Sequence, residues 1–130
     1  MIYLVLILSL FSGISQACVT SPQKIIPTKE LGFEFKEESF SACLNCKVIS
    51  ILIPVSYKNK PAAHAVFTVF QNEKIVSKSL VPFNKGINEN EFIGIVGDTN
   101  YFNYNVMIEY GNYRCMSYEF NYSGGKSDSH

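Results

Sequence analysis

The chain has 130 residues, of which 47% are hydrophobic and 14% aromatic, which is sufficient for one domain with a single core. Eleven basic residues balance eleven acidic residues, so the chain lacks the basic footprint that is typical of a nucleic-acid-binding domain. It also lacks a block of like charges of the kind that binds anionic lipid. The composition therefore indicates a globular domain and excludes recognition by charge alone.

Residues 1–17 have the pattern of a secretory signal peptide. The apolar run 2–11 is shorter than the roughly 20 residues that a membrane-spanning helix needs. Ser15 and Ala17 are small residues at the positions that precede a cleavage site. No basic residue precedes the run, so an uncleaved anchor is the alternative. We expect a secreted, extracellular protein that begins at Cys18 and has no transmembrane segment.

Two flanking segments differ in composition from the body of the chain. Residues 18–30 contain Pro22 and Pro27 and predict an extended N-terminal arm. Residues 124–130 are polar and rich in Gly and Ser, and they predict a disordered tail. The region 31–123 between them is expected to form one domain without internal repeats.

Within 31–123, apolar and polar residues alternate with the period of a half-buried β-strand. Turn-forming residues separate the runs, and Gly111-Asn112 is a candidate hairpin turn. Pro54 predicts an edge position or a bulge, and 37–46 has room for one short helical turn. We expect an all-β, two-sheet antiparallel β-sandwich of about seven strands, of the immunoglobulin or transthyretin kind. The expected strands are 31–36, 49–57, 65–70, 74–81, 91–96, 101–110 and 113–122.

Four cysteines in a secreted chain predict two disulfides with three possible connectivities, and they are Cys18, Cys43, Cys46 and Cys115. The spacing of Cys43 and Cys46 also suits a redox pair or half of a zinc site. A structural role is favoured, because no βαβ unit or complete ligand set accompanies the pair. We expect Cys43 and Cys46 to bond separately to Cys18 and Cys115, and we expect no metal and no cofactor.

Few residues suggest catalysis. His64 is the only histidine outside the tail, and no motif supplies it with a nucleophile or a carboxylate. Glu89 and Glu91 are spaced to face the same way on a strand, where an acid–base pair is possible but a solvated face is favoured. We therefore expect no catalytic residue.

Tyrosines cluster near the C-terminus of the chain. Core packing explains some of them, and Tyr101, Tyr104, Tyr113 and Tyr118 predict an exposed aromatic patch that binds a protein or a lipid. Asn121-Tyr122-Ser123 is a possible N-glycosylation sequon. An occupied Asn121 would keep that end of the hairpin free of partners.

Four short motifs of the chain occur together in one known family. They are Lys60-Pro61-Ala62-Ala63, then Ala65, Phe67 and Val69, Glu91-Phe92 before Gly97, and Ile108 and Tyr110 before Cys115. In these motifs the chain resembles the nematode transthyretin-like family, whose members carry a Lys-Pro-Ala turn that leads into a strand. The resemblance spans roughly 48–115, but Tyr57 stands where the family has its first cysteine, and the family's His-Asp pair is missing. It implies a secreted sandwich with an extracellular binding role and no enzymatic activity, and it transfers no functional residue.

The sequence favours a secreted, non-enzymatic binding or interaction protein that recognises an extracellular protein or lipid. A secreted thiol–disulfide oxidoreductase that uses Cys43 and Cys46 is the first alternative. The second is a carrier of a small apolar ligand held between the sheets. The sequence does not specify an oligomeric state.

Overall fold

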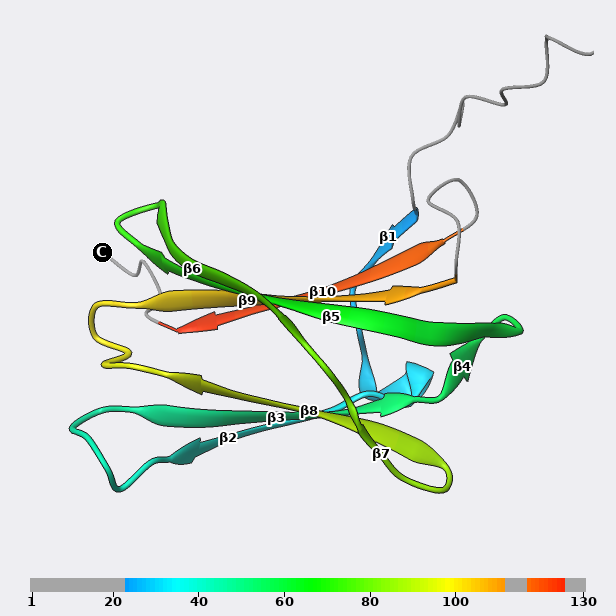
Figure 1. Ribbon diagram of the computed structural model, residues 1–130, viewed down its shortest axis with the longest axis horizontal. Helices are drawn as coiled ribbons and strands as arrows, with labels where there is room; N and C mark the ends of the chain where they lie inside the picture. Colours follow the sequence, from blue (N-terminus) through cyan, green and yellow to red (C-terminus); the bar gives the residue numbers. More distant parts are fainter. Residues whose placement is uncertain (1–22, 112–116, 126–130) are drawn as a thin grey trace, which may run out of the picture.

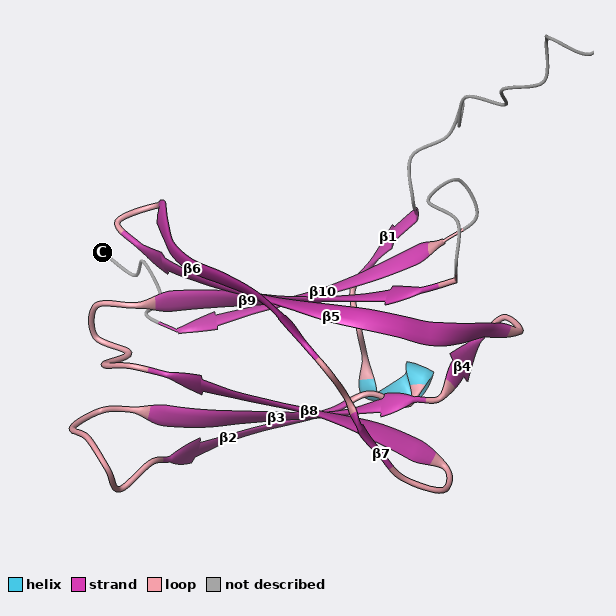
Figure 2. Cartoon of the chain, in the orientation of Figure 1, coloured by secondary structure: helices cyan, strands magenta, loops and turns pink. Residues whose placement is uncertain are grey.

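The computed structural model describes residues 23–111 and 117–125. They form ten strands and one short 3-10 turn over Lys29–Leu31 (Figure 1; Figure 2). No helix in this part of the chain is long and apolar enough to cross a membrane. The strands are β1 (Gln23–Ile25), β2 (Glu34–Ser39), β3 (Lys47–Pro54), β4 (Ser56–Tyr57), β5 (Lys60–Gln71), β6 (Lys74–Val81), β7 (Asn84–Lys85), β8 (Glu89–Val96), β9 (Asn103–Tyr110) and β10 (Tyr118–Gly125).

The strands form two sheets that lie as two layers in Figure 1. The first sheet has the order β1-β10-β9-β5-β4, with β6 also paired to β5, and the second has the order β2-β3-β8-β7. The described strand pairs are antiparallel except for β1 with β10. The all-β, two-sheet sandwich predicted from the sequence is therefore confirmed.

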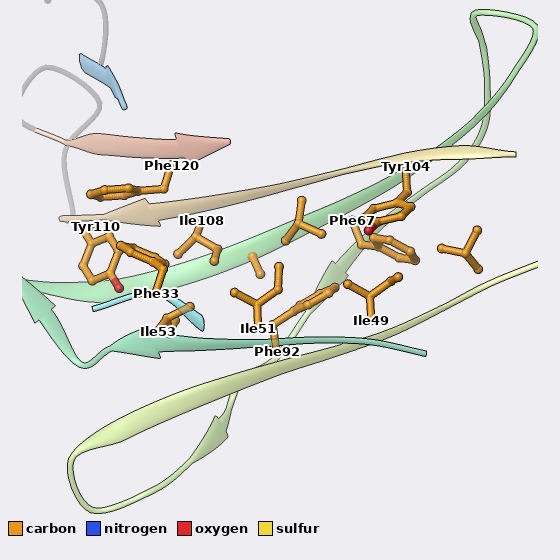
Figure 3. Close-up of a cluster of buried hydrophobic side chains, with 13 residues drawn as sticks. Phe33, Ile49, Ile51, Ile53, Phe67, Phe92, Tyr104, Ile108, Tyr110 and Phe120 are labelled. Carbon is orange, nitrogen blue, oxygen red and sulfur yellow. The ribbon is translucent and has the colours of Figure 1, made fainter. Parts of the chain in front are cut away.

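The core lies between the sheets because each central strand turns every second side chain inward. Burial alternates strictly along β9, and Ile49, Ile51 and Ile53 are buried on β3, as the sequence predicted. Figure 3 shows these side chains packed against aromatic rings that include Phe33 and Phe92. Each fully buried side chain of this size stabilises the fold by roughly 1.5 to 3 kcal/mol, so the alternating pattern determines which face of each strand turns inward.

Backbone geometry confirms turns in two of the segments that separate the expected strands. Lys58 and Asn59 connect β4 to β5, and Asn72 and Glu73 connect β5 to β6. All four residues have positive φ, between 47° and 65°. Two consecutive residues with positive φ form the type I′ turn that matches the twist of a hairpin.

Three aligned contacts show which strand of one sheet covers which strand of the other. Phe35 of β2 stacks on Tyr122 of β10 with ring centroids 4.1 Å apart. The Tyr110 hydroxyl on β9 donates a hydrogen bond of 2.6 Å to the carbonyl oxygen of Pro54 at the end of β3. Phe67 of β5 lies against Phe92 of β8, at 5.6 Å. Hence β2 lies opposite β10, β3 opposite β9, and β8 opposite β5.

The flanks differ in detail from the sequence prediction. The extended arm contains β1, whose pairing with β10 satisfies backbone groups of both strands, and β10 continues through Gly125 into the predicted tail. Residues 37–46 contain no helical turn, because β2 continues to Ser39 and a loop follows. The predicted signal peptide, Cys18, Tyr113, Cys115 and residues 126–130 lie outside the described residues.

Candidate functional site

One edge of the second sheet is left open by the shortness of β7. β7 pairs only Asn84 with Glu91 and Lys85 with Asn90. The following residues of β8, 92–96, pair with β3 on one side and with no described strand on the other. An unpaired run of backbone donors and acceptors at a sheet edge is a template for pairing with another chain.

The strand above this edge is β6, and much of its inner face is uncovered. Ser77 and Ser79 pair with Val69 and Phe67 of β5, and because Phe67 points into the core, the two serines point toward the second sheet. Both serines are nevertheless exposed. β6 thus extends past the edge of the second sheet at β8.

The space between β6 and the free edge of β8 is a groove of about 550 Å³. The loop from β8 to β9 closes one end through Gly97 and Phe102. None of the eleven residues that line the groove is charged. Three of the lining residues have large, apolar and well exposed side chains, namely Val76 at 55%, Ile95 at 53% and Ile93 at 41%. Ile93 and Ile95 alternate with the inward-facing Phe92, Gly94 and Val96, so their side chains are on the outer face of β8 beside its free edge.

Gly94 permits the close packing beneath the groove. A Cβ atom at this position would lie 2.9 Å from the Phe92 ring and 3.3 Å from the Phe67 ring. Those distances are too short for a carbon contact without displacing the rings. The glycine therefore allows the Phe67 and Phe92 rings to pack closely against β8, and Phe67 also lines the groove.

The tyrosine patch predicted from the sequence does not form on the described residues. Tyr104 is 1% exposed and belongs to the core, because it alternates inward along β9. Tyr101 is 66% exposed in the loop before β9, whereas Tyr118 pairs with Tyr110 at the opposite end of that strand. Strand alternation and the length of β9 separate the three side chains, so the prediction was wrong for them.

The described tyrosines have structural surroundings. The ring of Tyr118 lies 5.1 Å from that of Tyr57, and the Lys58 ammonium lies 5.3 Å from its centroid, which is within range of a cation–π contact. The Tyr104 hydroxyl donates a hydrogen bond of 3.4 Å to Glu37. Burial, followed by the neighbouring Tyr122 and Glu37, raises the pKa of Tyr104 well above its ordinary value.

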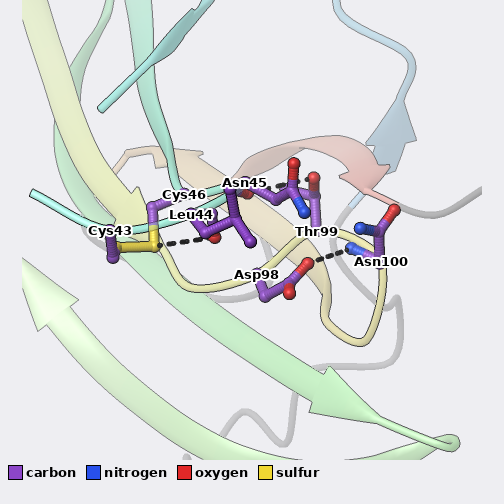
Figure 4. The surroundings of a disulfide bond; sticks show 7 residues. All are labelled: Cys43, Leu44, Asn45, Cys46, Asp98, Thr99 and Asn100. Carbon is purple, nitrogen blue, oxygen red and sulfur yellow. Dashed lines mark hydrogen bonds between the residues drawn. A yellow bond between two sulfur atoms is a disulfide. The ribbon is translucent and has the colours of Figure 1, made fainter. Parts of the chain in front are cut away.

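The structure joins Cys43 to Cys46 in a disulfide within the loop between β2 and β3 (Figure 4). The expectation that each would bond separately to Cys18 or Cys115 is therefore wrong. Asn45 adopts a left-handed conformation with φ of 57°, and this tight turn brings the two Cα atoms to 5.5 Å, within the range of disulfides. Cys43 is exposed, whereas Cys46 is 4% exposed.

The disulfide loop is attached to the loop that closes the groove. The carbonyl oxygen of Asn45 accepts hydrogen bonds from the backbone N–H of Thr99, at 3.0 Å, and from its hydroxyl, at 3.2 Å. Asp98 in turn accepts a hydrogen bond of 2.9 Å from the N–H of Asn100. These contacts, shown in Figure 4, connect the disulfide with residues 97–102 at the end of the groove.

The remaining candidates for chemistry lie apart from the groove. His64 Nε2 lies 3.1 Å from Glu109 Oε2 across β5 and β9, a cross-strand partner that no local motif could indicate. Glu91 accepts a hydrogen bond of 2.7 Å from Ser50 and lines a hollow that also contains Glu89 and Lys85. In the described part of the chain, no group of three His, Cys, Asp or Glu residues could hold a metal ion.

Asn121 of the possible sequon lies on β10, where it pairs with Met107 of β9. Its neighbour Phe120 is buried, so the Asn121 side chain is on the outer face of the first sheet. A glycan on Asn121 would cover that outer face and not the groove. Occupancy of the sequon stays a prediction.

Sequence reasoning missed the groove, although one signal was present. Residues 92–96 are apolar on both faces of the strand, a pattern that favours a strand buried on both sides. Only the order and lengths of the paired strands show that this segment is an edge. Comparisons with known protein families, with curated proteins and with solved structures found no match.

Proposed function

We propose that this chain is a secreted interaction protein that acts by binding an extracellular partner and not by catalysis. The observation that carries the proposal is the uncharged groove beside the free edge of β8. Large apolar side chains such as Ile95 and Val76 are costly to expose, and where they gather beside an open edge they mark a site of interaction. Secretion rests on the signal-peptide pattern and on the four cysteines, and the Cys43–Cys46 bond supports an oxidising compartment.

A partner that is a protein is favoured over a lipid surface. The groove offers backbone hydrogen-bonding groups along 92–96 as well as apolar side chains, and only another polypeptide satisfies both. Binding to a lipid bilayer is strengthened by basic residues, and the groove has none among its lining residues. The resemblance to the transthyretin-like family supports the same class of role.

The test is binding of the labelled mature protein to cells of its source, measured by flow cytometry. Ile95→Lys places a charge at an exposed position on the outer face of β8, beside its free edge, and we expect it to weaken binding at least tenfold while the fold is retained. Ile87→Lys is the matched control, because Ile87 is 97% exposed and lies outside the groove. Equal binding by both variants would contradict the groove as the site, and turnover of a substrate that depends on Glu91 or Cys46 would contradict the absence of catalysis.

A thiol–disulfide oxidoreductase is the second candidate, and the exposure of Cys43 within the Cys43–Cys46 disulfide favours it. A substrate thiolate would attack the exposed Cys43 Sγ, and Cys46 Sγ would leave as a thiolate and take up a proton. A second substrate thiolate would then attack the mixed disulfide and release Cys43, so that two substrate thiols become one disulfide while the pair gains two electrons. A disulfide such as oxidised glutathione would reoxidise the pair.

The oxidoreductase candidate is tested by reduction of insulin in the presence of dithiothreitol. Acceleration by the native protein that is lost in Cys46→Ser would support it. A rate equal to that of dithiothreitol alone would reject it.

A carrier of a small apolar ligand is the third candidate. The space between the sheets is occupied by the thirteen side chains of the core, so the groove is the better place for such a ligand. Native mass spectrometry of protein from its own host would then show a retained adduct, and a clean apo mass would count against a carrier.

A further inference from the structure

Four strands of the first sheet have a counterpart in the second sheet, and one of these counterparts is much shorter than its strand. β10, β9 and β5 of the first sheet lie opposite β2, β3 and β8 of the second, as the contacts Phe35–Tyr122, Tyr110–Pro54 and Phe67–Phe92 show. β6 is the next strand after β5, and β7 is its counterpart after β8. Because β7 ends after two residues, the place beside residues 92–96 and below β6 holds no described strand.

Resting on the binding function proposed above, we propose that one extended segment of a partner protein occupies this place as an added strand of the second sheet. The segment would pair with the free backbone edge of β8 and point alternate side chains into the groove below Ser77 and Ser79. This is recognition by strand addition, in which main-chain hydrogen bonds supply affinity and the pockets for alternate side chains supply specificity.

The lining of the groove defines the chemistry of the segment. No lining residue carries a charge, so a charged side chain of the partner would lose its water without gaining a counter-charge. Ile93 and Ile95 favour apolar side chains on one face of the segment, and the serine hydroxyls with Val76 favour small or apolar ones on the other. We therefore infer a run of about five uncharged residues, the length of the free edge of β8, with apolar character on both faces.

A second copy of this chain matches the free edge of β8 in sequence but not in shape. In an antiparallel pair centred on Gly94, Ile93 would lie opposite Ile95 of the copy, without any charge. The two-fold axis would place β8 of the copy below β6. Because β5 lies opposite β8 in each sandwich, β5 of the copy would then lie in the place that β6 occupies. Two strands cannot share one place, so the extension of β6 past β8 excludes a whole sandwich and admits a single strand.

Pairing of two β6 edges is also disfavoured. A two-fold register that sets Val76 opposite Leu80 of the copy places Lys78 opposite itself. Like charges directly opposite one another destabilise a strand pair. The sequence after Gly125 does not match the groove either, because Lys126 and Asp128 carry charges.

The experiment uses a phage-displayed library of random nine-residue peptides, selected on the mature protein and on its Ile95→Lys and Ile87→Lys variants. We expect enriched peptides with an uncharged central run that bind Ile87→Lys normally and Ile95→Lys at least tenfold more weakly. An enriched peptide is then synthesised with every second amide N-methylated, in both frames. One of the two frames should lose binding at least tenfold, because it removes the donors that pair with β8. Amide hydrogen exchange of alternate residues in 92–96 should slow when the unmodified peptide binds.

Three results would overturn the proposal. Equal binding of both N-methylated peptides would show that apolar side chains alone are recognised, as for a small apolar ligand. A dimer in sedimentation velocity that Ile95→Lys abolishes would identify a second copy as the occupant. If no enriched peptide depends on Ile95 for binding, strand addition is rejected. The cell-binding assay then separates the two proposals. If Ile95→Lys still abolishes cell binding, the proposed binding function stands and only strand addition fails.

Discussion

The two edges of the second sheet differ in their charged side chains and in how far the first sheet covers them. On one side β2 carries Glu34, Lys36 and Glu38 on its outer face, and its inner residue Phe35 is stacked on Tyr122 at 4.1 Å. On the other side the free part of β8 carries no charge, and the face of β6 above it is exposed. Charged side chains and a covering layer are the usual means of protecting a sheet edge from other chains. The molecule protects the β2 edge in both ways, whereas the free part of β8 has no charge and only the overhang of β6 above it.

The difference suggests that the open edge is kept for binding. An unprotected apolar edge invites aggregation, and β6 limits that risk because its overhang excludes the edge of another sandwich. If the groove binds a partner as proposed, its shape limits the partner to a single strand before any side-chain recognition takes place. The following variants test whether the two edges differ as described.

The largest expected effect comes from truncating the covered edge. Phe35→Ala removes a stacked, partly buried ring and should lower the free energy of unfolding by about 3 kcal/mol. Val76→Ala on the uncovered side should lower it by less than about 1 kcal/mol, because Val76 is 55% exposed. Urea unfolding of both variants measures the two values. Equal losses would show that β6 is covered in solution.

The disulfide joins the β2–β3 connection to the loop at the end of the groove. Replacing Cys43 and Cys46 by Ser should lower the free energy of unfolding by at most about 2 kcal/mol. The bridge joins residues with a sequence separation of 3, and closing so short a loop removes little conformational entropy from the unfolded chain. Thermal unfolding measures the loss. The Thr99 amide, which donates to Asn45, should exchange faster in the variant, and unchanged exchange would contradict the link between the two loops.

The free energy of unfolding at alkaline pH depends on the two buried tyrosines of β9, Tyr104 and Tyr110. Burial raises the pKa of Tyr104 and Tyr110 above the ordinary value of 10.0, so the folded chain keeps protons that the unfolded chain loses. Stability is therefore unaffected below about pH 10 and falls above it, by up to about 1.4 kcal/mol per pH unit for each tyrosine. Urea midpoints between pH 9 and 11 should fall less steeply for Tyr104→Phe than for the native chain. Equal slopes of the urea midpoint against pH for the two proteins would contradict a raised pKa of Tyr104 in the folded chain.

The smallest expected effect is a weak association created at the charged edge. Replacing Lys36 and Glu38 by Thr removes outer-face charges from β2 without touching the core. Each new cross-strand pair contributes about 0.2 to 1 kcal/mol, so a dimer should appear only at high concentration in sedimentation velocity. A native chain that already dimerises through β2 would show that charge does not protect this edge.

Local pattern was sufficient to predict most of the sandwich. Alternation along 101–110 and 49–57 identified the inward faces of β9 and β3, because burial of one face is the dominant energy in a sheet. The same alternation placed Tyr104 inward, so it could not also belong to an exposed patch. Residues 23–25 and 84–85 gave no strand signal, since their pairing depends on neighbours that are distant in sequence.

The candidate site could not be predicted in the same way. The groove exists because β7 is two residues long and β6 is eight, and these lengths depend on pairing across the sheet. The Cys43–Cys46 bond depends on the left-handed conformation of Asn45, which sequence spacing alone does not determine. Both features are products of tertiary geometry, whereas the apolar run 92–96 was visible in the sequence but ambiguous.

The most direct measurement compares the two edges with a photo-crosslinking residue. Benzoylphenylalanine is placed at Ile95 on the open edge and, in a second protein, at Lys36 on the charged edge, and each protein is irradiated on cells of its source. We predict a covalent adduct with one discrete partner from position 95 and none from position 36. Adducts of equal yield from both positions, or an adduct from position 36 alone, would contradict the claim that the open edge of β8 is the binding site.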